Sequence, residues 1–423
     1  MNAVVVGGGL AGLAAALDLV DAGARVTLLE ARPTLGGAVQ TLPAREGDPT
    51  PPPDNGQHIA LGCCTAYLEF LARIGRAGSV RREPLRLPAV DERGRVATLG
   101  SGALALLRYR HLSLRDRVSV ARVTRRLKRL RPGEHDGETF GALLRRLRSS
   151  DAAVDRFWDV FMRPALNIRS DEASAALALF TVHTALLGEP GASDLVLPVA
   201  PLGEMHGDAA GEALRRAGVD VRLRARVVAL DDGGVVLADG GRVDGDGVVV
   251  ALPPAEASQL LGEPEPGLGD SPIVSVHLLF DRKLLPGLLA ALLGSPAHWV
   301  FDRGRLTGNE PERGQYLTVV ASGVPDLARL RGRDLVNLMA REVTARLGPA
   351  ELLWSRVSRE PRATFLGAPG TGGRRPPVET GREGVVRAGA WVDTGWPATM
   401  EGAVRSGRAA ARVLLARHGH ATT

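Results

Sequence analysis

The strongest constraint on the fold is a glycine-rich turn near the N-terminus, Gly7-Gly8-Gly9-Leu10-Ala11-Gly12. It follows an apolar strand at residues 3–6 and opens an Ala- and Leu-rich helix at residues 13–22. Glycines at this spacing permit the tight turn and the close approach of a pyrophosphate to the helix N-terminus. A second strand, residues 25–29, ends at Glu30, whose carboxylate can accept hydrogen bonds from ribose hydroxyls. The pattern predicts a Rossmann-type dinucleotide-binding fold, with the nucleotide at Gly7, Gly9, Leu10, Ala11, Gly12 and Glu30.

Strand-like runs far along the chain are expected to return to this sheet. Further strands are predicted at residues 219–223, 226–230, 235–237, 247–252 and 384–388, with a final helix from Glu401 to about residue 417. Asp231-Asp232-Gly233-Gly234 separates two of these strands and is a hairpin signal. Both ends of the chain therefore carry parts of one nucleotide-binding domain.

The chain of 423 residues is long enough for two or three domain-sized units. We predict an α/β fold with α+β insertions, whose nucleotide-binding domain is discontinuous and comprises residues 1–75, 195–262 and 378–423. Residues 76–194 are predicted to be a helical insertion, and residues 263–377 a substrate-binding domain of mixed sheet and helices.

The residues after Glu30 narrow the choice of dinucleotide. Glu30-Ala31-Arg32-Pro33-Thr34-Leu35-Gly36-Gly37 resembles the extended fingerprint of the amine oxidase and carotenoid desaturase flavoproteins. Residues 248–254 resemble that superfamily's returning strand, and Ala388-Gly389-Ala390-Trp391 its C-terminal flavin motif, although an acid usually stands where Ala390 is. The resemblance implies FAD as the cofactor. Beyond the glycine loop and Glu30, it implies contacts at Ala31, Arg32, Gly36, Gly37, Val227, Gly389, Ala390, Met400, Glu401 and Ala403.

Three further blocks are similar to one group within that superfamily, the hydroxysqualene dehydroxylases. They are Asp54-Asn55-Gly56-Gln57-His58, residues 393–403, and Phe161-Met162-Arg163-Pro164-Ala165-Leu166-Asn167. The resemblance implies that reduced FAD converts hydroxysqualene to squalene, a reaction that needs a proton or strong hydrogen bond for the departing hydroxyl. Asp54 and His58 are the expected proton-handling residues, Gln57 is expected to orient the hydroxyl or the flavin edge, and Asp393 is a secondary acid.

Each of these residues has a structural alternative. Asp54 can serve only the turn beside Gly56, and His58 can be a buried structural histidine. Trp391 and Trp396 are expected to pack against the flavin or the core. No metal site is expected, because the histidines are scattered and the cysteines lack zinc-ligand spacing.

Two other function classes remain open on these residues. One is an oxidative relative, a carotenoid desaturase or an amine oxidase. The other is a flavin-bound scaffold or a nucleic-acid-binding protein that uses its arginines, although the flavin motifs argue against nucleic acid as a partner.

A basic segment between Arg108 and Arg131 carries apolar residues and is expected to be amphipathic. It predicts either peripheral contact with anionic lipid or a solvated helix face. With no apolar run long enough to span a bilayer, the chain is expected to be cytoplasmic, with a peripheral position on the inner face of the membrane. Residues 284–293 are rich in leucine and are predicted to be a core helix, or else a cap over a lipid entrance. The expected partners are an apolar isoprenoid substrate and the synthases of the same pathway.

Overall fold

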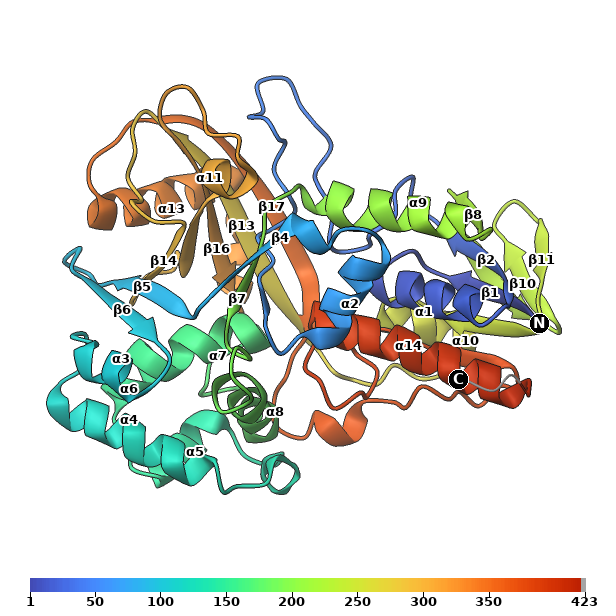
Figure 1. Ribbon diagram of the computed structural model, residues 1–423, viewed down its shortest axis with the longest axis horizontal. Helices are drawn as coiled ribbons and strands as arrows, with labels where there is room; N and C mark the ends of the chain where they lie inside the picture. The colour runs from blue at the N-terminus through green and yellow to red at the C-terminus, as the bar shows by residue number, and fades with distance from the viewer. Residues whose placement is uncertain (420–423) are drawn as a thin grey trace.

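The computed structural model describes residues 1–419, which form a parallel sheet, a large mixed sheet and a helical region (Figure 1). The parallel sheet has the order β18-β12-β1-β2-β8, and β1 pairs in parallel with both β12 and β2. Its strands are β1 (Asn2–Val6), β2 (Arg25–Glu30), β8 (Asp220–Leu223), β12 (Gly247–Val250) and β18 (Val385–Arg387). Three distant parts of the chain thus build one sheet, which confirms the predicted α/β class.

The first and last helices lie side by side over this sheet (Figure 1). They are α1 (Leu10–Asp21) and α14 (Met400–Arg417). Their backbones are close, because a Cβ atom on Gly407 would lie 2.0 Å from the carbonyl oxygen of Ala11. This packing brings the C-terminal motif to the N-terminal glycine turn. The helices α2 (Thr65–Arg73), α9 (Ala209–Arg216) and α10 (Pro254–Leu261) complete this part of the molecule.

Two small antiparallel sheets accompany the parallel one. The first has the order β11-β10-β9 and contains the predicted hairpin at residues 231–234. Its strands are β9 (Val227–Asp231), β10 (Gly234–Leu237) and β11 (Arg242–Asp244). The second, β3-β7-β4, consists of β3 (Ala60–Leu61), β7 (Leu195–Pro198) and β4 (Val80–Glu83).

The large sheet has seven strands in the order β17-β13-β16-β15-β14-β5-β6. Its strands are β5 (Arg86–Val90), β6 (Val96–Gly100), β13 (Asp270–Phe280), β14 (Leu289–Leu292), β15 (Trp299–Asp302), β16 (Gln315–Ser322) and β17 (Leu352–Phe365). Along β13, Val274, Val276 and Leu278 share one hydrophobic core with Leu335 and Met339 of α13 (Gly332–Leu347). Side chains alternate along a strand, so the residues between these valines face away from α13.

The leucine-rich segment 284–293 is not the predicted helix. It is a loop followed by β14, and Leu284, Leu285, Leu289 and Leu292 are buried. Three residues of β14 pair with β15 on one side and two pair with β5 on the other, so tertiary pairing decided the local structure. Burial of these leucines also excludes them as an exposed cap over a lipid entrance.

The same pairing bears on the predicted domains. β5 and β6 belong to the range 76–194, yet β5 joins β14 through Ala89 opposite Ala291 and Val90 opposite Leu292. The large sheet therefore includes residues 86–100, which the prediction placed in the helical insertion. The division into domains itself stays a prediction.

The helical region follows this boundary. Its helices are α3 (Ala103–Arg108), α4 (Leu114–Leu127), α5 (Phe140–Arg146), α6 (Asp151–Ala153), α7 (Asp159–Leu166) and α8 (Ala175–Thr181). Asn167 ends α7 with φ +53° and links it to the large sheet, donating to Ser271 O at 2.9 Å and accepting from Gly323 N at 2.6 Å. Two short helices, α11 (Arg303–Thr307) and α12 (Pro325–Arg329), lie among the sheet strands. Among residues 1–419, no helix combines the length and the hydropathy needed to cross a bilayer.

Candidate active site

The glycine turn leaves the N-terminus of α1 open to an anionic ligand. Gly9 precedes α1, and within the described residues no side chain caps this helix end. A Cβ atom on Gly7 would lie 2.3 Å from the carbonyl oxygen of Ala251, and one on Gly12 would lie 1.9 Å from that of Gly7. A Cβ atom on Gly9 would have its nearest neighbour, the Cα atom of Gly37, at 3.9 Å. The turn is packed on one side and open on the other, which fits a pyrophosphate against the first-turn amides.

The second glycine pair forms a wall beside this turn. The amide of Gly36 donates to the carbonyl of Gly8 at 2.8 Å, and Gly36 forms a parallel bridge with Gly9. Gly37 has φ +61°, and a Cβ atom there would lie 2.8 Å from the Cα atom of Gly9. Arg32 reaches across the pair, with Nη1 3.4 Å from the carbonyl oxygen of Gly37. The predicted residues Arg32, Gly36 and Gly37 are therefore brought to the glycine turn.

Glu30 lies at the same place, at the end of β2. Its Oε2 atom accepts from the amide of Gly8 at 2.6 Å, and its Oε1 atom accepts from the amide of Arg32 at 2.7 Å. Each carboxylate oxygen retains a lone pair for a ribose hydroxyl. The Glu30 carbonyl accepts from the Ala225 amide at 2.9 Å. Val227 follows Ala225 by two residues, so it lies close to the end of β2. Ala31 is exposed next to Glu30.

The C-terminal motif is fixed by a buried arginine. The guanidinium of Arg375 donates to the carbonyls of Trp391, at 3.3 Å, and Val392. Gly389 donates to Ser406 Oγ at 2.9 Å, which ties the same loop to α14. These contacts hold the backbone around Ala390, the position where the related flavoproteins usually carry an acid. Trp391 is buried and donates to Leu252 O at 3.0 Å, as expected of a packing residue.

The carboxylate of Glu401 is already engaged by protein. It is fully buried and accepts from the amides of Ala66 at 3.1 Å and Tyr67 at 2.7 Å. The Glu401 carboxylate thereby caps the N-terminus of α2. Arg405 Nε lies 2.6 Å from the same carboxylate. Contact of Glu401 with the cofactor stays a prediction, as it does for its neighbours Met400 and Ala403 in the first turn of α14.

Asp54 lies at the junction between the nucleotide-binding region and the large sheet. Its Oδ1 atom accepts from Thr41 Oγ1 at 2.7 Å and from the amide of Leu202 at 3.0 Å. Its Oδ2 atom forms an ion pair with Arg303 Nη1 at 2.6 Å, and both side chains are almost completely buried. Burial raises the pKa of Asp54, and the Arg303 guanidinium opposes this shift. The ion pair gives Asp54 a definite structural role.

Gln57 and His58 follow Gly56, which lies against β13. A Cβ atom on Gly56 would lie 3.2 Å from Ser275 Oγ and 3.7 Å from His58 Nε2. Burial lowers the pKa of His58 to about 4, so its imidazole is neutral at pH 7. His206 also has a pKa lowered to about 4, mainly by burial, and its Nε2 atom lies 2.8 Å from Tyr67 OH. A neutral His58 can exchange hydrogen bonds, but it does not supply a proton as an imidazolium.

Asp393 does not join this group. Its side chain is 54% exposed and accepts from the amide of Gly395 at 3.0 Å in a surface turn. Arg375 Nη1 lies 3.9 Å from its Oδ1 atom. Trp396 packs edge-on against Phe180, with ring centroids 5.2 Å apart.

Three residues that the sequence did not indicate lie beside Asp54 instead. Arg303 is its ion-pair partner, and the same guanidinium acts electrostatically on Tyr316 and His277. The rings of His277 and Tyr316 are 6.5 Å apart between centroids. The sequence of β13 does indicate a polar face, because Ser275 and His277 alternate with buried apolar residues. This alternation alone does not show which residues pack against that face.

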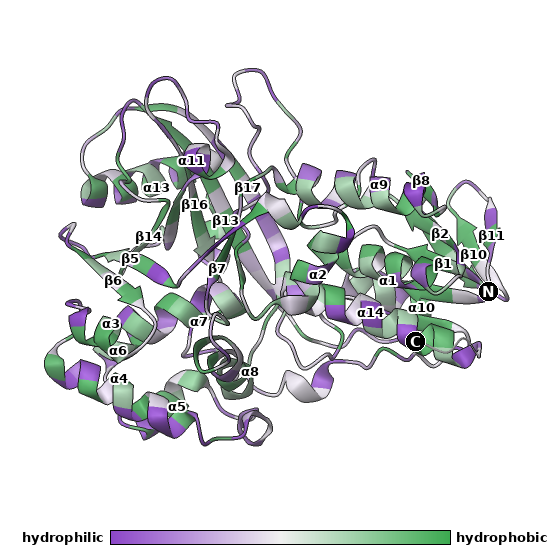
Figure 2. Cartoon of the chain, in the orientation of Figure 1, coloured by the Kyte–Doolittle hydropathy of each residue, from purple (hydrophilic) through white to green (hydrophobic). Residues whose placement is uncertain are grey.

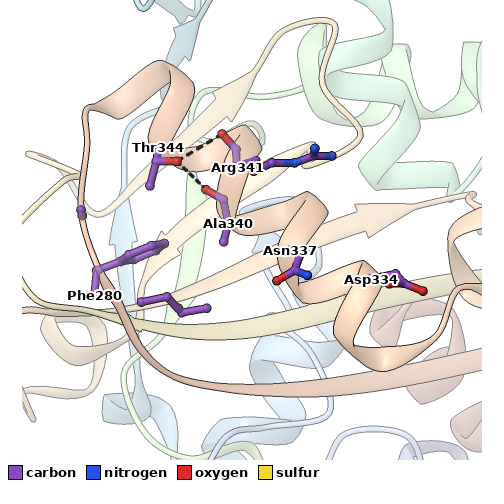
Figure 3. Close-up of a pocket in the computed structure, with 8 residues that line it drawn as sticks. Phe280, Asp334, Asn337, Ala340, Arg341 and Thr344 are labelled. Carbon is purple, nitrogen blue, oxygen red and sulfur yellow. Dashed lines mark hydrogen bonds between the residues drawn. The ribbon is translucent and has the colours of Figure 1, made fainter.

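A surface groove of about 600 Å³ lies elsewhere, along α13 (Figure 3). It is lined by Phe280, Asp334, Asn337, Ala340, Arg341 and Thr344. Asp334, Asn337 and Arg341 are exposed, and α13 covers the sheet face opposite His277. The groove is therefore separate from the residues around Asp54.

The sequence matches the family described as flavin containing amine oxidoreductase over residues 10–415. The chain belongs to this family. It is 30% identical to hydroxysqualene dehydroxylase of Rhodopseudomonas palustris, over 97% of this chain and 98% of that protein. The same enzyme of Sinorhizobium fredii is 29% identical, over 98% of each chain. The 15-cis-phytoene desaturase of Solanum lycopersicum is 26% identical, over 98% of this chain and 78% of that protein.

Solved structures show the same fold. An oxidoreductase from Methanosarcina mazei superposes with a TM-score of 0.75 at 17% identity, covering 97% of this chain and 99% of its own. Cyclohexylamine oxidase of Brevibacterium oxydans gives a TM-score of 0.71 at 18% identity, covering 99% of both chains. The resemblance seen in the sequence is confirmed, and this flavin-containing amine oxidoreductase is an FAD-dependent oxidoreductase.

Proposed function

We propose that this flavoprotein reduces hydroxysqualene to squalene. The observation that carries the proposal is the end-to-end similarity to hydroxysqualene dehydroxylases, at 30% identity over 97% of the chain. In this reaction the C–O bond of an allylic alcohol breaks, the oxygen leaves as water and a hydride takes its place on carbon. When bound, reduced FAD supplies that hydride.

The residues of this chain bind and orient the reactants. The first turn of α1 would hold the pyrophosphate of FAD, and the carboxylate of Glu30 its adenosine ribose. The loop of Gln57 and His58 follows the Gly36-Gly37 wall along the chain, and its Gly56 lies beside Ser275 of β13. We assign Gln57 to orientation of the alcohol or flavin edge and His58 to a neutral hydrogen bond.

The oxidative alternative is a phytoene desaturase or an amine oxidase. It has support in the 26% identity to a phytoene desaturase, but that relative is matched over only 78% of its length.

Anaerobic mixing of the photoreduced holoenzyme with hydroxysqualene tests the proposal. We expect reoxidation of the flavin at 450 nm in one turnover, about one equivalent of squalene and no requirement for oxygen. A flavin that stays reduced, while the oxidised enzyme is reduced by phytoene or an amine, would establish the oxidative alternative.

We propose further that α3 and α4 bring the enzyme to an anionic membrane surface, where such an apolar substrate resides. Four exposed side chains on these helices are apolar, between 56% and 67% accessible: Leu104, Leu107, Leu114 and Val118. Exposed arginines flank them, and Asp116 is the only acid between residues 101 and 131. Figure 2 shows polar and apolar residues alternating along α4. Exposed leucines within a cationic rim suit the headgroup region of anionic lipid.

This surface differs in part from the apolar face expected from the sequence, which comprised Leu112, Val118, Val123, Leu127 and Leu130. Val118 is exposed, but Leu112, Val123 and Leu127 are buried against the protein. Leu104, Leu107 and Leu114 complete the exposed apolar face. Location at the inner face of the membrane and contact with pathway synthases are part of this proposal.

A further inference from the structure

The face of the large sheet that turns away from α13 is unusually polar. Ser275 and His277 of β13 lie on it, and both are completely buried. His277 is opposite Thr318 on β16 and opposite Arg356 on β17. Buried strand faces are normally apolar, as the α13 side of this sheet is. Polar groups retained in such a place need partners.

On this face, Tyr316 OH, His277 Nε2 and Ser275 Oγ make no hydrogen bond of good geometry among the described residues, and neither do Arg303 Nε and Nη2 or Asp54 Oδ2 beside it. The nearest polar neighbours are within the group itself, Arg303 for Tyr316 and the Asp54 backbone for His277. Arg303 and Tyr316 are each 1% exposed, and His277 is 0% exposed. A protein interior leaves few such atoms unpaired, and a group of them in one place indicates a bound polar ligand or water.

We propose that Arg303, Tyr316 and His277 form a polar subsite for the oxygen atom of the alcohol substrate and for the water formed from it. The proposal rests on the proposed function and deepens it. The Nε and Nη2 atoms of Arg303 offer N–H donors, and Tyr316 offers a hydroxyl. A hydroxyl oxygen of the substrate can accept from the guanidinium while it donates to the imidazole or phenol.

The charge of the subsite selects for a neutral oxygen group. Arg303 is compensated by Asp54 at 2.6 Å, so the pair is close to neutral as a unit. His277 is also neutral, because burial and the neighbouring Arg303 lower its pKa to about 3. A carboxylate or phosphate would meet the Asp54 carboxylate, and a protonated amine would meet the Arg303 guanidinium. An alcohol or a water molecule meets neither penalty.

The subsite also places donors where charge develops. As the C–O bond breaks, its electron pair moves to the oxygen, and N–H donors of Arg303 stabilise that charge. The balanced change is alcohol plus hydride plus proton, giving hydrocarbon plus water, with both hydrogens supplied by fully reduced FAD. Loop contacts connect this place to the cofactor wall, because Asn55 N donates to Gln40 O at 3.0 Å, three residues after Gly37.

Binding of the alcohol and of the hydrocarbon to the oxidised holoenzyme tests the subsite. The probes are hydroxysqualene and squalene, and the readout is the ligand-induced change in the flavin absorption spectrum. We expect the wild type to bind the alcohol about tenfold more tightly than the hydrocarbon. Tyr316→Phe and Arg303→Lys should each reduce this ratio to about threefold or less, the lysine preserving a cation for Asp54.

Tyr109→Phe is the matched control. Tyr109 is also a buried tyrosine, but its hydroxyl donates to the carbonyl of Arg156 at 2.7 Å, in the helical region. This variant should retain the tenfold ratio and melt at a lower temperature. Tyr316→Phe removes a hydroxyl that makes no hydrogen bond of good geometry to the protein and has only Arg303 near it, so this variant should melt closer to the wild type than Tyr109→Phe does.

The two proposals fail in different ways. If the wild type reduces the alcohol in single turnover while both subsite variants keep its binding ratio, the subsite is wrong and the proposed function stands. If wild-type reduced flavin does not react with the alcohol and its binding ratio is one, the proposed function is wrong and the subsite is overturned with it.

Discussion

The Nη1 atom of Arg303 lies 2.6 Å from the Oδ2 atom of Asp54, deep between the nucleotide-binding region and the large sheet. Asp54 also accepts from Thr41 and from the Leu202 amide. One carboxylate therefore connects α11 to two segments on the cofactor side. A buried ion pair of this kind is sensitive to the loss of either partner, because the remaining charge is left without compensation.

We predict that Asp54→Asn lowers the free energy of unfolding by about 3 kcal/mol. Arg303→Gln should have a similar effect, because it leaves the Asp54 carboxylate buried without a cation. The double variant should lose less than the sum of the two single losses, by at least about 1 kcal/mol. Urea denaturation of the four proteins gives this double-mutant cycle. Losses that add to within about 0.5 kcal/mol would show that the two charges do not stabilise one another.

The glycine turn predicts opposite outcomes for two similar substitutions. Gly12→Ala would place a Cβ atom 1.9 Å from the Gly7 carbonyl oxygen, so the apoprotein should lose stability and melt several degrees lower. Gly9→Ala meets no atom closer than 3.9 Å, so its apoprotein should melt like the wild type. Its methyl group nevertheless lies beside the open helix end, and FAD affinity should fall about tenfold or more.

Thermal unfolding of the apoproteins and quenching of FAD fluorescence separate the two effects. Wild-type FAD affinity in Gly9→Ala would place the pyrophosphate elsewhere than at this turn. An apoprotein of Gly12→Ala that melts like the wild type would show that the turn has room to shift.

The sequence predicted the nucleotide-binding half because its signals are local. A glycine turn, an acid after the second strand and a hairpin at residues 231–234 each depend on neighbouring residues, and the structure contains all three. Residues 284–293 were predicted wrongly for the converse reason. A short apolar run fits a buried strand as well as a helix, and pairing with β5 and β15 decided between them.

The sequence could not predict that Arg303, His277 and Tyr316 lie beside Asp54, for a related reason. Arg303 follows Asp54 by about 250 residues, and their contact depends on where α11 sits after β15. His277 and Tyr316 approach one another only through the register in which Leu279 is opposite Tyr316. Nothing in the sequence around Asp54 fixes either relationship. Asp393, by contrast, was selected for its motif, and the structure leaves it in an exposed turn.

Buried histidines predict how stability depends on pH. The pKa values of His58 and His206 are lowered to about 4, and those of His277 and His298 to about 3, chiefly by burial. In the unfolded chain histidine titrates near 6.5, so between that pH and about 4 the unfolded state binds more protons. Folded stability is therefore lost as the pH falls through this range, by about 1.4 kcal/mol per pH unit for each such histidine.

His206→Gln isolates one of these contributions. The variant should reduce the slope of unfolding free energy between pH 6 and pH 5 by about 1.2 kcal/mol per unit, whatever its effect at pH 7. Urea unfolding at several pH values measures the slope. A slope equal to that of the wild type would mean that His206 is protonated in the folded protein.

The exposed surface of α3 and α4 gives a last prediction. Leu107 and Leu114 are 56% and 67% exposed, and burying part of each in a lipid headgroup region should contribute to binding. The double variant Leu107→Gln/Leu114→Gln should bind vesicles containing anionic lipid about tenfold more weakly than the wild type, as measured by co-sedimentation. Vesicles of zwitterionic lipid alone, or high salt, should weaken wild-type binding, because the flanking arginines attract anionic headgroups.

The control for this surface must be equally apolar and equally exposed but lie on other elements. Val228 on β9 is 53% exposed and Leu353 on β17 is 50% exposed, and neither belongs to α3 or α4. Val228→Gln/Leu353→Gln should therefore bind anionic vesicles like the wild type, which would separate loss of a lipid-facing surface from a general gain in polarity. Equal binding by both double variants and the wild type would remove α3 and α4 as the membrane contact. In that case the arginine-rich face is only solvated, which is the alternative that the sequence left open.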